Sequence, residues 1–237
     1  MKFNNVSLLS LTCLVPAILL ALSLPAHATG MVPETSVLLV DAAKGQATMN
    51  VKNTDAGPLL LYTNVVDVLD EKEPGRLLVT QPVVRVEAGQ TQMVRFIYTA
   101  TNPSQVEKLK RVSFEGIPPK DKNKNVLTVS IRQDLPVIIH PSNLADNPTP
   151  WKGLVWTKSG NTITVSNPSK YIVRLSQQVV LLPSNVPGDI GKTYLLPGQV
   201  VSVSIKNPEK ISTLTQVKIF PATRYGYQSN SDTQPLK

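Results

Sequence analysis

The sequence predicts an all-β protein made of two small sandwich domains. Short stretches in which apolar and polar residues alternate recur along most of the chain, and this period of two is typical of strands with one buried face. Turn residues separate these stretches, and the 20 prolines of the chain fit many turns and strand ends. No segment shows the 3.6-residue apolar period that predicts an amphipathic helix.

Residues 1–28 have the features of a secretory signal peptide. Lys2 gives the N-terminal region a positive charge, residues 6–24 are largely apolar, and the Ala-His-Ala sequence at residues 26–28 is typical of a cleavage site. Pro16 and this cleavage site disfavour the alternative, an uncleaved membrane anchor. No later stretch is long and apolar enough to cross a bilayer. We therefore expect an exported, soluble mature protein without a membrane anchor.

We expect residues 29–141 to form the first domain. Before the loop that follows Pro119, strand-like stretches are predicted at residues 36–40, 47–52, 59–68, 77–80, 83–86, 91–99 and 110–116. Their number and their short connections are typical of an immunoglobulin-like sandwich.

The last strand of this domain, Asn125–Pro141, is the most unusual stretch of the chain. Large aliphatic residues alternate with polar ones up to Arg132, and a nearly continuous apolar run follows, interrupted by Pro136. Because proline has no N–H for a sheet ladder, we predict that the strand has a free edge over part of its length. A long apolar edge strand invites pairing with another chain. The alternative is a buried sandwich strand with one face in the core.

Residues 142–237 are expected to form the second domain. Pro141, Pro148 and Pro150 predict a sharp corner between the two sandwiches, which would give a boomerang shape. Further strands are predicted at residues 154–157, 161–165, 172–182, 200–205, 216–220 and 223–228.

Composition excludes most kinds of catalytic chemistry. The single cysteine, Cys13, and one of the two histidines, His27, belong to the signal peptide, which leaves His140 alone in the mature chain. A His/Cys metal site is then excluded, and neither a nucleophile elbow nor a glycine-rich phosphate loop is present. We expect no enzyme, no metal and no cofactor. The net charge of +8 suits an acidic partner, but 5% aromatic residues offer no stacking platform for nucleic acid.

An ordered set of short motifs resembles the PapD-like periplasmic pilus chaperones over nearly all of the mature chain. The motifs are Val51–Asn53, Val79–Val86, Ala88–Gln90, Val94–Ile97, Phe114–Pro119, Asn125–Pro141, Asn167-Pro168 with Tyr171, and Leu196–Gly198. The resemblance implies a periplasmic protein that binds pilus or fimbrial subunits and delivers them to an outer-membrane usher. It also implies that Leu127, Val129 and Ile131 insert into a subunit that lacks its own final strand and take the place of that strand's side chains.

The chain departs from the family pattern where the subunit's terminal carboxylate is usually held. Ser36 and Pro136 stand where the family has an arginine and a lysine. Arg132 is the preferred replacement, because a guanidinium can bind a carboxylate with two hydrogen bonds. The other candidates are Arg95, Arg111 and Arg174, and the alternative for Arg132 is an exposed charge that aids solubility.

The family also ties its domains together with an acid–base–acid set of charges. Glu107 matches the first acid, His140 stands in the place of the base, and Arg224 stands where the second acid is expected. A direct Glu107–Arg224 pair would replace the set and would fix the orientation of the domains more than it adds stability.

Two other classes of function stay open. A secreted β-sandwich adhesin, or another surface-binding protein, would need exposed aromatic residues, whereas Trp151 and Trp156 are expected to pack at the domain boundary. A periplasmic hydrolase is disfavoured by the missing nucleophile and base.

Overall fold

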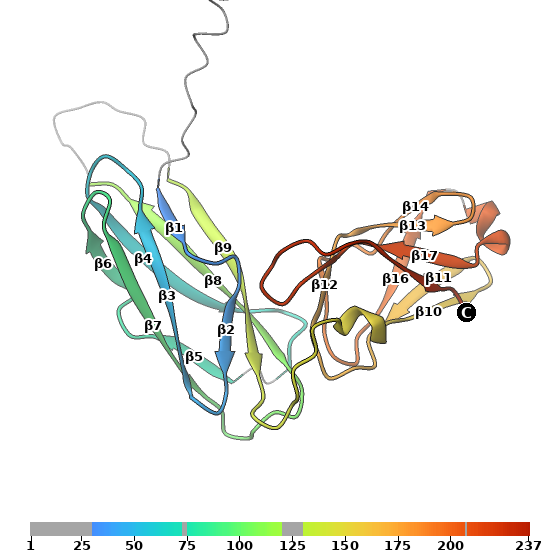
Figure 1. The fold of residues 1–237 in the computed structure, drawn as a ribbon, viewed down its shortest axis with the longest axis horizontal. Helices are drawn as coiled ribbons and strands as arrows, with labels where there is room; N and C mark the ends of the chain where they lie inside the picture. The colour runs from blue at the N-terminus through green and yellow to red at the C-terminus, as the bar shows by residue number, and fades with distance from the viewer. Residues whose placement is uncertain (1–29, 73–74, 120–129, 207) are drawn as a thin grey trace, which may run out of the picture.

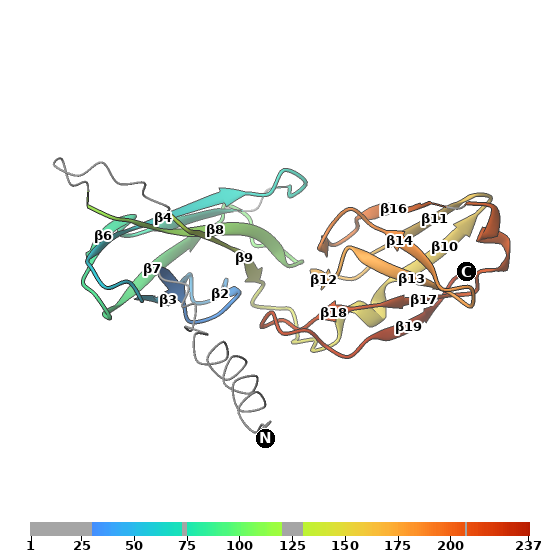
Figure 2. The ribbon, with the colours of Figure 1, turned by 90° about the horizontal axis from the view of Figure 1, so that it is seen from above.

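The structure is a computed structural model that describes residues 30–72, 75–119, 130–206 and 208–237, without the side chains of residues 208–210. The predicted signal peptide, Leu127 and Val129 lie outside the described residues. Figures 1 and 2 show two lobes of strands that meet at an angle, so the predicted two-domain β architecture is confirmed. Among the described residues, no helix is long and apolar enough to cross a membrane.

The first domain is a sandwich whose two layers are connected by one short strand. Its strands are β1 (Met31–Pro33), β2 (Leu38–Asp41), β3 (Gln46–Asn53), β4 (Leu59–Asp67), β5 (Arg76–Val79), β6 (Val83–Val86), β7 (Thr91–Thr99), β8 (Lys108–Ile117) and β9 (Arg132–His140). One layer has the order β5-β7-β3 with β1 on β3, and the other has β9-β8-β4-β6. The link is β2, which pairs with β3 at Asp41 and runs parallel to β9.

Alternation of side chains builds the core of this sandwich. Along β7, Val94, Phe96 and Tyr98 are buried, while the residues between them point outward. Phe96 meets Phe114 of the opposite layer edge to face, with ring centroids 6.4 Å apart, a favoured aromatic geometry. The period of two that predicted this strand therefore reflects one buried face.

Strand β9 separates two environments. Val137 and Ile139 point into the core of the first domain, whereas Ile138 belongs to a smaller apolar cluster that includes Ile172 and Leu196 of the second domain. On one side β9 pairs with β8 from Arg132 to Ile139, but on the other it pairs with β2 only from Val137 onward. No described strand covers the edge from Arg132 to Pro136. The predicted partly free edge is confirmed for the described residues.

The second domain begins after the corner that follows β9. Its elements are η1 (Pro150–Gly153), β10 (Val155–Ser159), β11 (Thr162–Ser166), β12 (Val173–Leu175), β13 (Gln178–Leu182), β14 (Val186–Asp189), β15 (Tyr194–Leu195), β16 (Val200–Ile205), η2 (Pro208–Thr213), β17 (Gln216–Ile219), β18 (Pro221–Ala222) and β19 (Asp232–Pro235). The main sheet has the order β10-β11-β16-β14-β13-β17-β19, and β15-β12-β18 form a small sheet. The position of the domain boundary at residue 142 stays a prediction.

The main sheet of the second domain closes on itself through the chain's last residues. Lys158 N donates to Lys237 O, and Lys237 N donates to Trp156 O, which ties the end of the chain to β10. The buried Trp156 also donates its indole N–H to Gln234 Oε1 at 2.8 Å. Trp151 and Trp156 are 5% and 1% exposed, so their predicted packing role is confirmed.

Three sequence predictions in this domain are wrong. Residues 172–182, predicted as one strand, form β12 and β13, which belong to two different sheets. Residues 223–228, predicted as a strand, form the turn between β18 and β19, with Gly226 at φ +89°. Residues 183–191, predicted as a turn, contain β14 despite its proline and glycine. A Cβ on Gly188 would come within 2.8 Å of Val203 Cγ1, so this strand needs a glycine for close packing rather than for a turn.

Each sandwich contains a buried asparagine that holds a turn in place. Asn53 Nδ2 donates to the carbonyls of Gly57, Val86 and Glu87, and its Oδ1 accepts from the N–H of Asp55. Asn167 plays the same part in the second domain, where Nδ2 donates to Tyr171 O and Leu195 O. Both residues are 0% exposed.

We expect Asn53→Ala to lower the free energy of unfolding by about 1–3 kcal/mol, because it leaves buried backbone groups without a partner. Urea unfolding followed by circular dichroism measures the change. Asn50→Ala, on the exposed face of β3, is the matched control and should have less effect. Equal stability of both variants and the unmodified protein would contradict this role for the buried amide.

Candidate functional site

The free edge of β9 is the first part of the candidate site. Ile131, immediately before β9, is 44% exposed. By sequence spacing it continues the row of Leu135, Val137 and Ile139 along one face. Leu127 and Val129, predicted to act with it, lie outside the described residues.

Arg132, the predicted carboxylate anchor, lies on the opposite face and already has a partner. It stands across from Glu115 in the β8–β9 ladder, with its Nε 3.3 Å from Glu115 Oε2. The Arg132 side chain is 56% exposed. An ion pair of this exposure adds little stability and can be exchanged for another partner. Arg132 as the anchor therefore stays a prediction.

A cavity of about 290 Å³ lies where the unpaired part of β9 ends. Ser36 and Pro136, the two positions that depart from the family pattern, both line it, together with Leu109, Arg111, Asp134, Leu135, Arg174, Thr193 and Tyr194. Arg174 and the last two of these residues belong to the second domain, so the cavity is formed by both domains.

The two arginines of this cavity differ in their partners. Arg111 Nε donates to both carboxylate oxygens of Asp134 at 3.0 and 2.9 Å, and its Nη2 donates to Asp134 O. The buried Nη1 of Arg174 has no hydrogen-bond partner among the residues that the structure describes. Burial lowers the pKa of Arg174, and the neighbouring positive charge of Arg111 lowers it further. The cavity therefore contains an incompletely satisfied cation.

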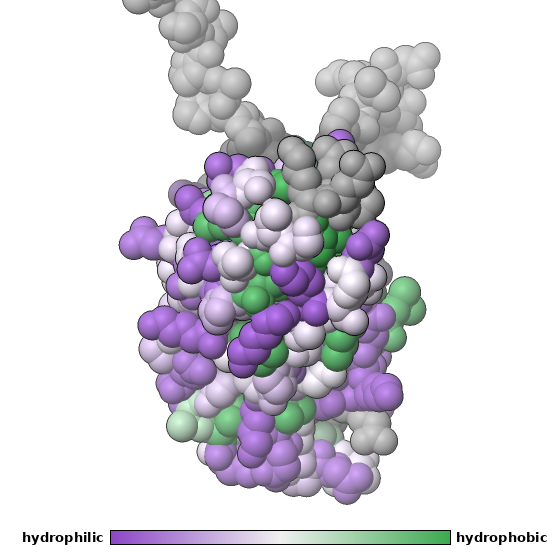
Figure 3. All heavy atoms as spheres, turned by 90° about the vertical axis from the view of Figure 1, so that its right-hand side faces the viewer, coloured by the Kyte–Doolittle hydropathy of each residue, from purple (hydrophilic) through white to green (hydrophobic). Residues whose placement is uncertain are grey.

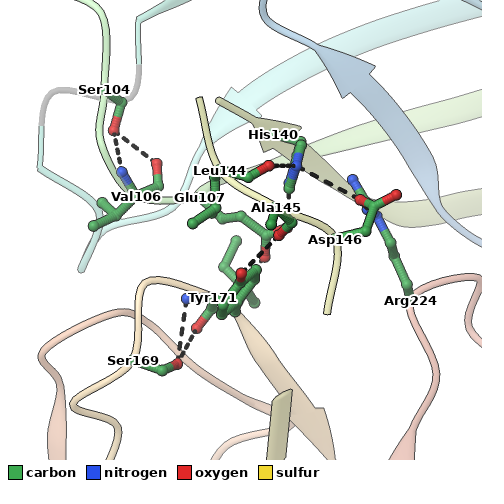
Figure 4. Close-up of polar contacts among 11 residues, drawn as sticks. Ser104, Val106, Glu107, His140, Leu144, Ala145, Asp146, Ser169, Tyr171 and Arg224 are labelled. Atoms are coloured by element: carbon green, nitrogen blue, oxygen red, sulfur yellow. Dashed lines mark hydrogen bonds and ion pairs between the residues drawn. The ribbon is translucent and has the colours of Figure 1, made fainter. Parts of the chain in front are cut away.

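A group of polar contacts fixes the joint between the domains next to this cavity (Figure 4). Glu107, 4% exposed, places Oε1 2.9 Å from His140 Nδ1 and accepts the backbone N–H of Ile172 at Oε2, also at 2.9 Å. The other ring nitrogen of His140 lies 2.8 Å from Leu144 O. A single buried carboxylate thus connects β9 to the second domain.

Glu107, His140 and Arg224 all lie at the joint, but the direct Glu107–Arg224 pair that we expected is not formed. Arg224 pairs instead with Asp146 of the corner segment, and Asp146 Oδ1 lies 3.6 Å from His140 Nε2. The physical reason is that His140 and Asp146 occupy the space between the two predicted partners. Asp146 was missed because nothing in its local sequence distinguishes it from other polar corner residues.

Two further contacts hold the domains against each other. Asp70 pairs with Lys192, and this hydrogen bond holds the pKa of the Asp70 carboxyl below its usual value. On the opposite rim, the turn between β18 and β19 reaches the first domain (Figure 1), where Ser36 Oγ donates to Tyr225 O at 3.3 Å. A Cβ on Gly226 would collide with Ser36 Oγ, so this approach requires the glycine. The orientation of the domains is therefore constrained around the cavity.

Comparison with known proteins assigns this arrangement to a class. Residues 30–145 match the model of the pili and flagellar-assembly chaperone PapD N-terminal domain, and residues 149–233 match that of the pili assembly chaperone PapD C-terminal domain. The chain therefore belongs to the PapD-like family of pili assembly chaperones.

Individual relatives agree with this assignment. The chain is 54% identical over 210 residues to the uncharacterized fimbrial chaperone YhcA of Escherichia coli K12, covering 89% of this chain and 92% of the relative. It is 27% identical to the chaperone protein PmfD of Proteus mirabilis, covering 88% and 85%.

Solved structures show the same fold. The SafB chaperone of Salmonella enterica, in complex with SafA pilin, superposes with a TM-score of 0.72 at 22% identity, covering 89% of this chain and 98% of the other. The CupB2 chaperone of Pseudomonas aeruginosa gives 0.70 at 22% identity, with 87% and 100% covered.

We expect Glu107→Ala to loosen the joint, because the Ile172 N–H loses its acceptor and His140 loses its partner. Small-angle X-ray scattering should show a broader distribution of inter-domain distances, and the free energy of unfolding should fall by about 1–3 kcal/mol. Glu87→Ala removes an exposed pair with Arg85 far from the joint and is the control, with little expected change in stability. An unchanged scattering curve for Glu107→Ala would show that this carboxylate does not fix the domains.

Proposed function

We propose that the chain is a periplasmic chaperone that binds fimbrial subunits by lending them a strand and then delivers them to an outer-membrane usher. The observation that carries the proposal is the half-paired β9, whose edge is open from Arg132 to Pro136. An incomplete sandwich can add this strand through backbone hydrogen bonds.

The aliphatic row supplies the apolar part of the contact. A subunit that lacks its last strand has a groove between its sheets, and a row of side chains spaced two residues apart fills such a groove. Burying one large aliphatic side chain stabilises a complex by roughly 1.5–3 kcal/mol. We assign Leu127, Val129 and Ile131 this role.

The sequence supports an exported, non-catalytic protein. Residues 1–28 have the features of a signal peptide, and the mature chain has no cysteine and one histidine. Within the described part of the chain, no group of three or more His, Cys, Asp or Glu residues could hold a metal ion. We propose the periplasm as its compartment and binding, rather than turnover, as its activity.

The tryptophans give the adhesin alternative no support, although Tyr225 and Tyr227 are 62% and 73% exposed. Both tryptophans are buried, so neither offers an aromatic platform to a glycan. Figure 3 looks onto the end of the second domain, where hydrophobic residues lie in small separate groups between polar ones. Co-purification separates the two functions: a chaperone stabilises a co-expressed fimbrial subunit in a stoichiometric complex, whereas an adhesin binds a glycan array.

We expect Ile131→Asp to reduce capture of a co-expressed fimbrial subunit about ten-fold or more, because a charge replaces an aliphatic side chain in an apolar groove. Leu127→Asp and Val129→Asp should act in the same direction. Recovery of subunit with the affinity-tagged chaperone measures the effect, and circular dichroism checks folding.

Val200→Asp is the matched control, because Val200 is a 64% exposed aliphatic residue of the second domain. It should capture subunits normally. Full capture by all three donor-strand variants would contradict donor-strand complementation through this row.

A further inference from the structure

We propose that Tyr225 and Tyr227 form a second contact surface for the fimbrial subunit, apart from the strand with which the subunit pairs. Both tyrosines lie in the turn between β18 and β19 of the second domain, which reaches the first domain beside β2 (Figures 1 and 2). Through this contact the second domain takes part in selecting the subunits that are bound. The proposal rests on the proposed function, since it takes the bound chain to be a fimbrial subunit.

The exposure of the two tyrosines is the first observation behind the proposal. Every other aromatic residue in the described part of the chain is buried or half-buried, whereas Tyr225 and Tyr227 are both largely exposed. A tyrosine ring combines a large apolar face with a hydroxyl group, and tyrosines are therefore enriched in protein interfaces. Two exposed tyrosines in one turn indicate a contact surface for another protein.

Local contacts order the turn that carries the tyrosines. Thr223 N donates to Tyr227 O at 2.7 Å, and Gly226 N donates to Thr223 O at 2.9 Å. Tyr227 N also donates to Thr223 Oγ1 at 3.2 Å. Arg224 pairs with Asp146 of the corner segment (Figure 4). An ordered turn loses less conformational entropy when a partner binds than a mobile loop does, which favours a contact here.

The position of the turn indicates which partner it contacts. Ser36 Oγ donates to Tyr225 O, and Ser36 also lines the cavity at the end of the open edge of β9. A chain added to that edge has to leave it at Pro136, because β2 pairs with β9 from Val137 onward. The turn therefore lies beside the point where the added chain leaves β9, and its surface continues the one that binds the subunit.

A hollow next to Tyr225 indicates the kind of subunit side chain that fits. Asp146 and Arg224 balance each other's charge as an ion pair, so the hollow has no net charge to attract an ion. Pro148 and the ring of Tyr225 give it apolar walls, and we expect it to take an apolar or uncharged polar side chain. The hollow has a volume of about 410 Å³ and is lined by Asp146, Asn147, Pro148, Thr223, Arg224 and Tyr225.

Photo-crosslinking tests the contact itself. The photoreactive residue p-benzoylphenylalanine is placed at Tyr225 or at Tyr227 in the full chain, which is co-expressed with a fimbrial subunit and irradiated. Both positions should crosslink to the subunit. The same replacement at Val200, an exposed residue of the second domain outside the turn, is the control and should not crosslink. Crosslinking no stronger than that at Val200 would overturn the contact.

Competition for a limiting amount of subunit tests how much the contact contributes. The unmodified chaperone and the double variant Tyr225→Ser, Tyr227→Ser are co-expressed at equal levels with different affinity tags. We expect the unmodified chaperone to recover about ten-fold more subunit, because truncated interface tyrosines often cost much of the affinity. Val200→Ser should compete equally with the unmodified chaperone, and circular dichroism checks the folding of each variant.

A glycine variant separates the position of the tyrosines from their chemistry. Gly226→Ala keeps both rings, but the added Cβ would collide with Ser36 Oγ and lie 3.0 Å from Val37 Cγ2. The φ of +89° at this position also disfavours alanine, so the turn has to move away from the first domain. We expect subunit recovery between that of the unmodified chaperone and that of the double variant. Recovery equal to that of the unmodified chaperone would overturn the placement of the contact beside β9.

The remaining outcomes separate this contact from the proposed function. Equal recovery by the double variant and the unmodified chaperone, with Ile131→Asp still losing the subunit, would overturn the tyrosine contact while the proposed function stands. Glycan-array binding that the double variant loses, together with unchanged subunit recovery, would assign the tyrosines to a carbohydrate and likewise overturn it. Failure of the unmodified chaperone to recover any subunit would instead reject the proposed function.

Discussion

The pairing of β9 determines which part of the first domain stays open to another chain. Strand β8 covers one edge from Arg132 to Ile139, whereas β2 covers the other only from Val137. Pro136 stands at the change and has no N–H to offer a ladder. The first half of the strand therefore keeps an edge that another chain can pair with, while the second half anchors it in the core of the first domain.

The joint between the domains places the cavity at the end of this open edge. Glu107 connects β9, through His140, to the backbone of Ile172, and Arg174 follows two residues later on β12. The joint between the domains and the end of the open edge therefore lie next to each other.

Local patterns predicted the strands well and the contacts between domains poorly. The alternation in residues 91–99 predicted β7 to the residue, and Pro136 predicted the open edge. The strand β14 was missed because its proline and glycine resemble a turn, although Gly188 serves close packing. The cavity brings together Ser36, Arg111 and Arg174, which are far apart in the chain. The local periodicity of a sequence does not indicate which distant residues come into contact in the folded protein.

Amide hydrogen exchange of β9, compared between the free chaperone and its complex with a fimbrial subunit, shows whether a subunit pairs with the open edge. We expect the amides between Arg132 and Leu135 that point away from β8 to exchange rapidly in the free protein and to become protected in the complex. The amides from Val137 to Ile139 should be protected in both. Unchanged exchange between Arg132 and Leu135 in a stoichiometric complex would show that the subunit does not pair with this edge.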